Sequence, residues 1–434
     1  MTTTRTMLCA AVAMVGLALG ASPAAADDVP LPTAQAVAMH AEFLTQAPTP
    51  DNPGVTCIVD TGVNSNADTD AAVIGRQTIY PGDGTDGDPV AHHGTYLAMN
   101  IAAPANGWGM VGIAPQTRIL SIRAIDNGAH TFQSVSYTQG LDRCRSAKVN
   151  DGLNVTTALL ALGHSATDTT ADGQAVQAKV DQLRANGISV VAAAGNDGGG
   201  VQWPARYGSA FAVGGSDSNG NFCGSTSRGP ELEVSALGCG ADSAVWDTGS
   251  PATIDGTSTS AGLVAGVLTA LRSYQPDLTP DQAEWLLTST ASGTGSTKVI
   301  DVAAAFRATG LGGMVDAYQP PPRVAPPTPA IINVGTVCPD GGMLCQKPQL
   351  VRAKRKQRKI TLTVAALPPG AFLQARVSRR WHNSTTASVS LRVKHWRRIV
   401  LRFGGLDGGR SPTLTITPRT LRRYTHRKRH NQGL

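Results

Sequence analysis

The chain has 434 residues, of which 41% are hydrophobic, and its formal net charge is +7. That length is too great for one ordinary domain and is ample for a large buried core. The charge is unevenly placed. The part from Leu350 to the end holds 21 lysines and arginines but a single acid, Asp407, which makes it +20 and leaves −13 for the rest. Composition therefore excludes one evenly charged domain and indicates two bodies with different electrostatics.

The first 26 residues have the pattern of a secretory signal peptide. One positive charge, Arg5, precedes an apolar run from about Met7 to Leu19, and small residues end in Ala-Ala-Ala at 24–26. This pattern predicts cleavage near Asp27 and a secreted protein, extracellular or associated with a cell surface. A membrane anchor is the weaker alternative because the apolar run is shorter than a membrane span requires. No later segment is expected to cross a membrane.

Residues 27–50 form a short Ala-rich segment, for which we predict one helix and no identifiable role. From 51 to 309, continuous apolar runs alternate with amphipathic helical patterns. Such runs are typical of strands buried on both faces, as in a parallel sheet covered by helices. The predicted fold class is therefore α/β, a doubly wound, mostly parallel sheet with helices on both faces. The runs interpreted as strands are GVTCIVD, TRILSIRAI, VTTALLALG, ISVVAAAGN and SAFAVGG.

Beyond residue 309 the character of the chain changes twice. Residues 310–335 include QPPPRVAPPTPA, whose prolines favour an extended, semi-rigid linker. Residues 336–434 hold short runs with roughly period-two alternation between turn residues, which predict a small antiparallel β domain with a disordered tail. The predicted strands lie in ITLTVAAL, FLQARVS, ASVSLRVKHW, RRIVLRF and TLTITP.

Six cysteines remain once Cys9 leaves with the signal peptide, and an even number suggests disulfides in an exported chain. The count alone leaves many pairings open. Neither a C-x-x-C pair nor a His-rich cluster is present, so a zinc site is not predicted. The pairs favoured by proximity in sequence are Cys338–Cys345 and Cys223–Cys239, which leaves Cys57–Cys144.

Three short motifs hold residue types that do chemistry, although each alone has a simpler explanation. In CIVDTGV, Asp60 ends an apolar strand, where α/β folds place ligands, but an Asx turn explains it equally simply. In AHHGTYLAMNIA, His93 precedes Gly-Thr and a helical run; His92 is its rival, and either is more simply a structural histidine. In IDGTSTSAGLVAGVLTAL, a helix begins near Ser258, whose hydroxyl is either a cap or a nucleophile at the positive end of the helix dipole.

Together, in the order Asp, His, Ser, these motifs contain the parts of a charge-oriented nucleophile. His93 would take the proton of Ser258, and Asp60 would orient His93 and stabilise its cation. The sequence resembles the subtilisin-like serine proteases, the subtilases, whose triad has the same chain order. The resemblance covers about residues 51–309. VVAAAGND is similar to the strand that ends in the family's oxyanion-hole asparagine, at Asn196, and further blocks follow in order: WGMVGIAPQTRILSIRAI, VQWPARYGSAFAVGGSDSNGN and SRGPELEVSALG.

This resemblance implies a serine endopeptidase that cleaves polypeptides through an acyl-enzyme and requires no cofactor. The side-chain amide of Asn196 and the backbone N–H of Ser258 would hold the oxyanion. The alternative is a catalytically inactive, subtilase-like binding protein, against which the intact triad speaks. Substrate would pair as an extra strand with one edge of the cleft, formed by Ala161, Leu162 and Gly163.

The chain departs from the subtilase pattern at positions that spare the proton-transfer and oxyanion groups. Tyr96 stands in place of a second histidine, Gly262 in place of a proline, and His164 in place of a glycine. Gly262 is expected to loosen the start of its helix, and His164 to alter the side-chain pockets. A folding propeptide is expected to be absent, because only 24 residues separate the predicted cleavage site from Asp51.

Subtilases often bind calcium in the loop that here reads PANGWGMVG. Asn106 could supply an oxygen there, with Asp68 or Asp70 nearby, and oxygen ligands suit calcium. Calcium is therefore a candidate structural ion, although Asn-Gly in a loop is more often simply a turn.

The basic run RAKRKQRK, followed by Trp381 and Trp396, has the composition of a surface that grips anionic groups. In an exported protein this favours anionic cell-surface polymers, bound by residues 336–434, over nucleic acid. The plain alternative is a solvated basic face. The protein is expected to be a monomer.

Overall fold

The computed structural model describes residues 31–88, 91–125, 134–163, 171–293 and 295–320, together with seven strands between Leu350 and Ile416. The predicted signal peptide, residues 321–335 of the predicted linker, and the tail lie outside the described residues.

A seven-stranded parallel sheet forms the centre of the first 320 residues, in the order β2-β3-β1-β4-β5-β6-β7. The chain winds outward from β1 in both directions, so the predicted doubly wound fold is confirmed. Two strands were missed, β2 and β7, because they lie at the edges of the sheet and are only partly buried. The strands are β1 (Val55–Asp60), β2 (Val73–Thr78), β3 (Arg118–Arg123), β4 (Val155–Leu160), β5 (Ser189–Ala193), β6 (Phe211–Ser216) and β7 (Leu232–Leu237).

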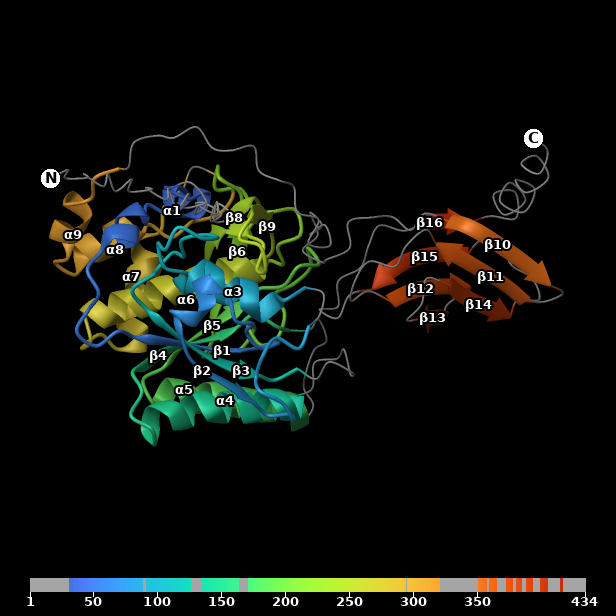
Figure 1. Cartoon of the computed structure of the whole chain (residues 1–434), viewed down its shortest axis with the longest axis horizontal. Coiled ribbons are helices and arrows are strands. Elements are labelled where there is room, and N and C mark those ends of the chain that lie inside the picture. The colour runs from blue at the N-terminus through green and yellow to red at the C-terminus, as the bar shows by residue number, and fades with distance from the viewer. Residues whose placement is uncertain are drawn as a thin grey trace, which may run out of the picture.

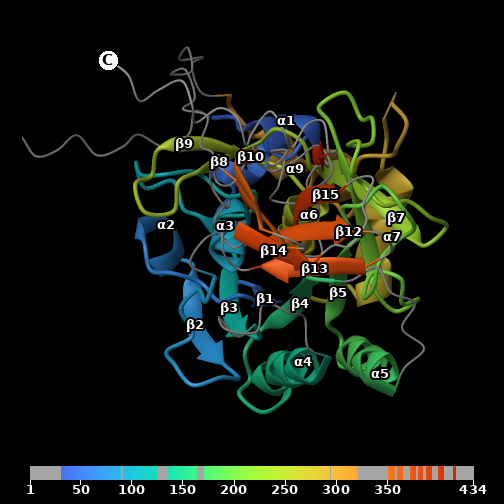
Figure 2. The same cartoon turned by 90° about the vertical axis from the view of Figure 1, so that its right-hand side faces the viewer.

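Helices cover both faces of this sheet, as Figures 1 and 2 show. Consecutive residues of β1 face opposite cores, with Ile58 on one side and Cys57 and Val59 on the other. Among the described residues, no helix is long and apolar enough to cross a membrane. One face carries α3 (His93–Ala102), α6 (Thr257–Tyr274), α7 (Pro280–Thr290) and α8 (Val302–Ala308), and the other carries α4 (Ser134–Val149) and α5 (Ala171–Ala185).

Two of the three predicted disulfides are present, and the third lies outside the described residues. Cys57–Cys144 joins β1 to α4, with the Cα atoms 5.8 Å apart. Cys223–Cys239 joins the segments that follow β6 and β7, with the Cα atoms 6.1 Å apart. Both bonds hold strands of the central sheet to their surroundings.

The N-terminal segment, for which the sequence indicated no role, packs against the body of the fold. Its described part contains α1 (Ala34–Ala38) and the short 3-10 helix η1 (Glu42–Gln46). The Ala34 N–H donates to Asp242 Oδ2 at 2.6 Å, in the hairpin of β8 (Ala241–Ala244) and β9 (Pro251–Ile254). The Phe43 ring packs edge-on against Phe306 of α8, with the ring centroids 5.0 Å apart.

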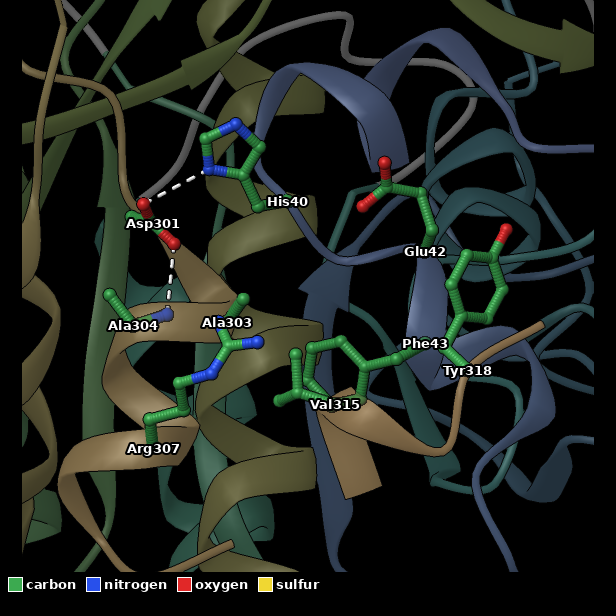
Figure 3. A pocket seen from close by; sticks show the side chains of 9 residues that line it. All are labelled: His40, Glu42, Phe43, Asp301, Ala303, Ala304, Arg307, Val315 and Tyr318. Carbon is green, nitrogen blue, oxygen red and sulfur yellow. Dashed lines mark hydrogen bonds and ion pairs between the residues drawn. The ribbon is translucent and has the colours of Figure 1, made fainter. Parts of the chain in front are cut away.

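A cavity of about 250 Å³ lies between this segment and the helices that end the body of the fold (Figure 3). At its rim, His40 Nδ1 lies 3.0 Å from Asp301 Oδ2. Tyr318 and Arg307 line it from α8 and the residues after α9 (Gly312–Asp316), a helix that occupies part of the predicted linker. No residue of the predicted catalytic site lines this cavity.

Two antiparallel sheets make up the described strands after Leu350, which confirms an antiparallel β region there. The predicted alternation is present in β11, where Ile360, Leu362 and Val364 are buried and Thr361 and Thr363 are half-buried. The basic run forms a further strand, β10. The first sheet is β10 (Leu350–Lys356), β11 (Lys359–Val364) and β14 (Ser388–Arg392), and the second is β13 (Arg380–Ser384), β12 (Phe372–Val377), β15 (Ile399–Gly404) and β16 (Leu414–Ile416).

Candidate active site

The three predicted triad residues lie at the ends of three elements that meet at one edge of the sheet. Asp60 is the last residue of β1, His93 the first residue of α3, and Ser258 lies in the first turn of α6. Gly94 allows β1 and α3 to approach closely, since a Cβ there would lie 2.2 Å from the Gly62 carbonyl oxygen. The arrangement follows the general rule that α/β sheets carry their sites at the carboxyl ends of the strands.

Asp60 and His93 form a direct, buried pair. Oδ1 of Asp60 lies 2.8 Å from His93 Nδ1 and also accepts the Thr61 N–H at 2.8 Å. The Asp60 side chain is 1% exposed and that of His93 is 26% exposed. Because Nδ1 is held by the carboxylate, Nε2 is the ring nitrogen left for proton transfer. Asp60 Oδ2 is buried with no hydrogen-bond partner in the described part of the chain, so few donors compete with His93 for this charge.

The structure separates His93 from its rival, His92. His92 has a left-handed backbone conformation, with φ at 46°, and precedes the first turn of α3. Its Nδ1 lies 3.1 Å from Asn64 Nδ2, and its ring stacks on Trp246 with the centroids 4.5 Å apart. Thus only His93 contacts Asp60.

The environment of His93 favours the charged imidazolium. Burial lowers its pKa, but the charge of Asp60, the hydrogen bond from that carboxylate, and the charges of Asp88 and Asp86 outweigh burial and raise the pKa to about 9. An imidazole with this pKa becomes a general base mainly in alkaline solution.

Ser258 presents its hydroxyl to the neighbouring cleft edge. Its Oγ donates to the carbonyl oxygen of Ala161 at 3.0 Å. The helix begins at Thr257, one residue before the predicted start, after Gly256 at φ 128°. Ser260, the other serine of this turn, is buried and donates to the Ala236 carbonyl oxygen at 3.1 Å, as expected of a packing hydroxyl.

Asn196 is held so that its amide nitrogen faces the start of α6. Its Oδ1 accepts both the backbone N–H and the hydroxyl of Thr257, each at 2.9 Å, which fixes the orientation of the amide. A Cβ built on Gly256 would lie 3.8 Å from Asn196 Nδ2 and 3.9 Å from the backbone nitrogen of Ser258. Two N–H donors therefore flank one small space beside Ser258, the geometry that an oxyanion requires.

The predicted substrate-binding residues directly follow β4. Ala161 is the partner of Ser258, and the Leu162 carbonyl accepts the Tyr137 hydroxyl at 3.2 Å. A Cβ on Gly163 would lie 2.1 Å from the Trp203 carbonyl oxygen, so this position has no room for a side chain. His164, expected to alter the pockets, lies outside the described residues.

The candidate calcium residues come together, but their partners do not fit a cation. Asp68 is fully buried; its Oδ2 accepts the Met110 N–H at 3.0 Å, and its Oδ1 lies 3.4 Å from Asn106 Nδ2. The oxygen of Asn106 accepts the Trp108 N–H at 2.9 Å, which turns its NH₂ toward Asp68. Asp70 pairs instead with Arg76 at 2.7 Å. Calcium needs six or more oxygen ligands, whereas Asp68 faces N–H donors.

A match to a family model decides the relationship of this chain to known proteins. The model described as the subtilase family matches residues 53–312, more than half of the chain. The chain belongs to the subtilase family.

Among curated relatives, this subtilase is 34% identical to alkaline elastase YaB of Bacillus sp. (strain YaB) over 260 residues, which are 58% of the chain and 64% of the relative. The chain thus spans less than two thirds of that relative's length. It is 33% identical to subtilisin DY of Bacillus licheniformis over 55% of the chain and 83% of the relative. It is 32% identical to subtilisin Savinase of Lederbergia lenta over 58% of the chain and 91% of the relative.

Solved structures with the same fold include two proteases. The structure titled as a protease of Pseudoalteromonas arctica PAMC 21717 has a TM-score of 0.55 at 23% identity, covering 62% of this subtilase and 94% of that chain. MycP1 with its N-terminal propeptide removed has a TM-score of 0.53 at 22% identity, covering 63% and 96%. These likenesses concern the fold.

Sequence reasoning missed two residues that support the site. Thr257 fixes the Asn196 amide and also accepts the Gly195 N–H at 3.2 Å. Asp86, seven residues before His93, bonds to the first turn of α3 through Thr95. Both are short polar residues in turns, where local turn chemistry is the ordinary explanation, so only the fold distinguishes them.

Proposed function

We propose that this subtilase is a serine endopeptidase in which Asp60, His93 and Ser258 form the catalytic triad. The observation that carries the proposal is the 2.8 Å contact between Asp60 Oδ1 and His93 Nδ1 at the sheet edge where Ser258 begins α6. Asn196 supports the same reading, because its amide nitrogen and the Ser258 N–H flank one space.

In the proposed mechanism, neutral His93 accepts the proton of Ser258 at Nε2 while the serine oxygen attacks a peptide carbonyl. Asp60 stabilises the imidazolium that forms, and the oxyanion receives hydrogen bonds from Asn196 Nδ2 and the Ser258 N–H. The imidazolium then gives its proton to the leaving amine, which releases the first product and leaves an acyl-enzyme. Water attacks the acyl-enzyme by the same proton path, and Ser258 is regenerated.

Polypeptides are the proposed substrates, recognised mainly through their backbone along Ala161, Leu162 and Gly163. This edge continues β4 and lies beside Ser258. The closed position at Gly163 favours a main-chain contact over a side-chain pocket, as in strand addition.

We also propose that the protein is secreted and that residues 336–434 attach it to anionic surface polymers. The signal-like N-terminus and the disulfides support export. The charge of +20 beyond Leu350 supports attachment.

An active-site fluorophosphonate probe tests the proposed peptidase. Folded wild-type protein is expected to be labelled in alkaline buffer, and Ser258→Ala is expected to lose the label. Ser260→Ala is the matched control, since it removes a hydroxyl from the same helical turn and should remain labelled. An unlabelled, folded wild-type protein would favour the inactive binding protein, and labelling that survives in Ser258→Ala would place the nucleophile elsewhere.

A further inference from the structure

A fourth carboxylate lies close to the triad, in the loop between β2 and α3. Asp86 Oδ2 accepts the Thr95 N–H at 3.1 Å and the Thr95 hydroxyl at 2.6 Å, and its Oδ1 accepts the Asp88 N–H at 3.0 Å. Thr95 is only two residues after His93. The Asp86 side chain is therefore fixed to the turn of α3 that carries the proposed general base.

The same loop is fastened to the turn that follows Asp60. The Asp86 N–H donates to Asn64 Oδ1 at 3.1 Å, and the Asn64 N–H donates to the Thr95 hydroxyl at 2.9 Å. The Gly87 N–H donates to the Thr61 carbonyl at 2.7 Å. Asp86 thus lies where the turn after β1 meets the start of α3, and the relative position of these two elements sets the distance between Asp60 and His93.

The charges that surround His93 in this region are all negative. Asp60 approaches from β1, and Asp86 and Asp88 approach from the loop before α3; all three raise the pKa of His93. Asp88 is 6% exposed, and its Oδ1 accepts the Ala91 N–H at 3.0 Å. Burial raises the pKa of Asp86 itself to about 6, although hydrogen bonds from Thr95, Asp88 and Thr61 lower it. Asp86 is therefore charged in the alkaline range, where His93 loses its proton.

We propose that Asp86 is a positioning residue of the triad, which locks the turn after Asp60 to the first turn of α3 and, together with Asp88, makes His93 a more basic group that works in alkaline solution. Asp86 touches neither substrate nor the reacting atoms; it acts through Thr95 and through its charge. The proposal rests on the function proposed for His93.

The decisive measurement is the titration of the His93 ring, followed by NMR in the full chain, with Asp86→Asn compared with wild type. Removing one nearby negative charge is expected to lower the midpoint by about half a unit to one unit. The pH at which kcat/KM reaches half its maximum is expected to move down equally. Asp83→Asn is the matched control, because Asp83 lies in the same loop, is exposed, and bonds to Thr85; it should leave both midpoints in place.

An unchanged His93 midpoint in folded Asp86→Asn would overturn the proposal, even if turnover fell, because lost turnover alone indicates only a structural role. If Asp86→Asn does not fold, Asp88→Asn decides by the same criterion, since it removes a charge without touching the bonds to Thr95. The NMR titration needs no catalysis. A shifted midpoint in a protein that cleaves no peptide would therefore support the role of Asp86 while contradicting the peptidase.

Discussion

Ser258 donates its hydroxyl proton to the carbonyl oxygen of Ala161, 3.0 Å away, at the edge proposed to bind substrate. A serine hydroxyl carries one proton, so this hydrogen bond excludes one from Ser258 to His93 Nε2. His93 competes for that proton only when it is neutral, because the imidazolium has no free acceptor. The resting arrangement therefore links the orientation of the nucleophile to the protonation state of His93.

The first prediction concerns the pH dependence of activity. The pKa of His93 is raised to about 9 by three carboxylates despite its burial. Because only neutral His93 accepts the serine proton, kcat/KM on a peptide substrate is expected to rise with pH with a midpoint near 9. A profile of kcat/KM measured across the alkaline range checks this, and a midpoint near 6.5, the ordinary value for histidine, would contradict it.

The same pKa makes a prediction about stability. The folded-state pKa of His93 lies above its unfolded value of 6.5, so protonated His93 stabilises the fold below pH 6.5. This contribution is lost as the pH rises from 6.5 through about 9. Denaturant unfolding should show a free energy of unfolding that falls over this window, and the fall should be smaller in His93→Gln, which cannot titrate.

Asn196 supplies a donor to the oxyanion, so we expect Asn196→Ala to reduce kcat by about 10²–10³-fold. Asn196→Asp should lose more, because a carboxylate oxygen would face the developing negative charge. KM should change little in either variant, since the donor acts mainly in the transition state. Asn219→Asp, in the exposed turn after β6, is the control. Equal losses in kcat and KM affinity for both would instead indicate a damaged cleft.

Two glycines of α6 are expected to respond oppositely to replacement by alanine. A Cβ on Gly262 would lie 3.3 Å from the flexible end of Leu97, whereas one on Gly266 would lie 2.8 Å from Ile113 Cγ2 and 3.2 Å from Ile101 Cγ2. Gly262→Ala should be neutral or stabilising by up to about 1 kcal/mol, because alanine favours a helix. Gly266→Ala should be destabilising, since a packed core must shift. Thermal unfolding compares the two, and a larger loss from Gly262→Ala would contradict the packing.

The buried Asp68 predicts indifference to chelators. Its carboxylate is bound by the Met110 N–H and faces the amide of Asn106, donors that stabilise it without a cation. EDTA should therefore leave the melting temperature unchanged. Asp68→Ala should cost about 1–3 kcal/mol, because it leaves the buried Met110 N–H unsatisfied. A drop in melting temperature on chelation, reversed by added calcium, would show that this account is wrong.

The sequence predicted most of the fold because its signals are local. Apolar runs fix the central strands, and Asp60, His93 and Ser258 could be found because each follows or begins an element that ends at the same sheet edge. The basic strand β10 was missed since its charges hide the alternation, although it pairs with β11 along its length. The role of the segment around Phe43, and the bonds from Asp86 to Thr95, join residues whose proximity only the folded chain creates.

The last prediction concerns the basic C-terminal region. Its first strand, β10, carries Arg352, Lys354, Arg355 and Lys356 and pairs with β11, whose buried residues alternate with half-buried ones. Replacing Lys354, Arg355 and Lys356 with glutamine in the full chain is expected to weaken retention on an anionic matrix, and removing residues 336–434 should abolish it. Retention should fall with added salt, because salt screens exposed charges. Peptide hydrolysis should be unchanged in both variants, since the subtilase match ends at residue 312. Full retention of the truncated protein would refute attachment through this region.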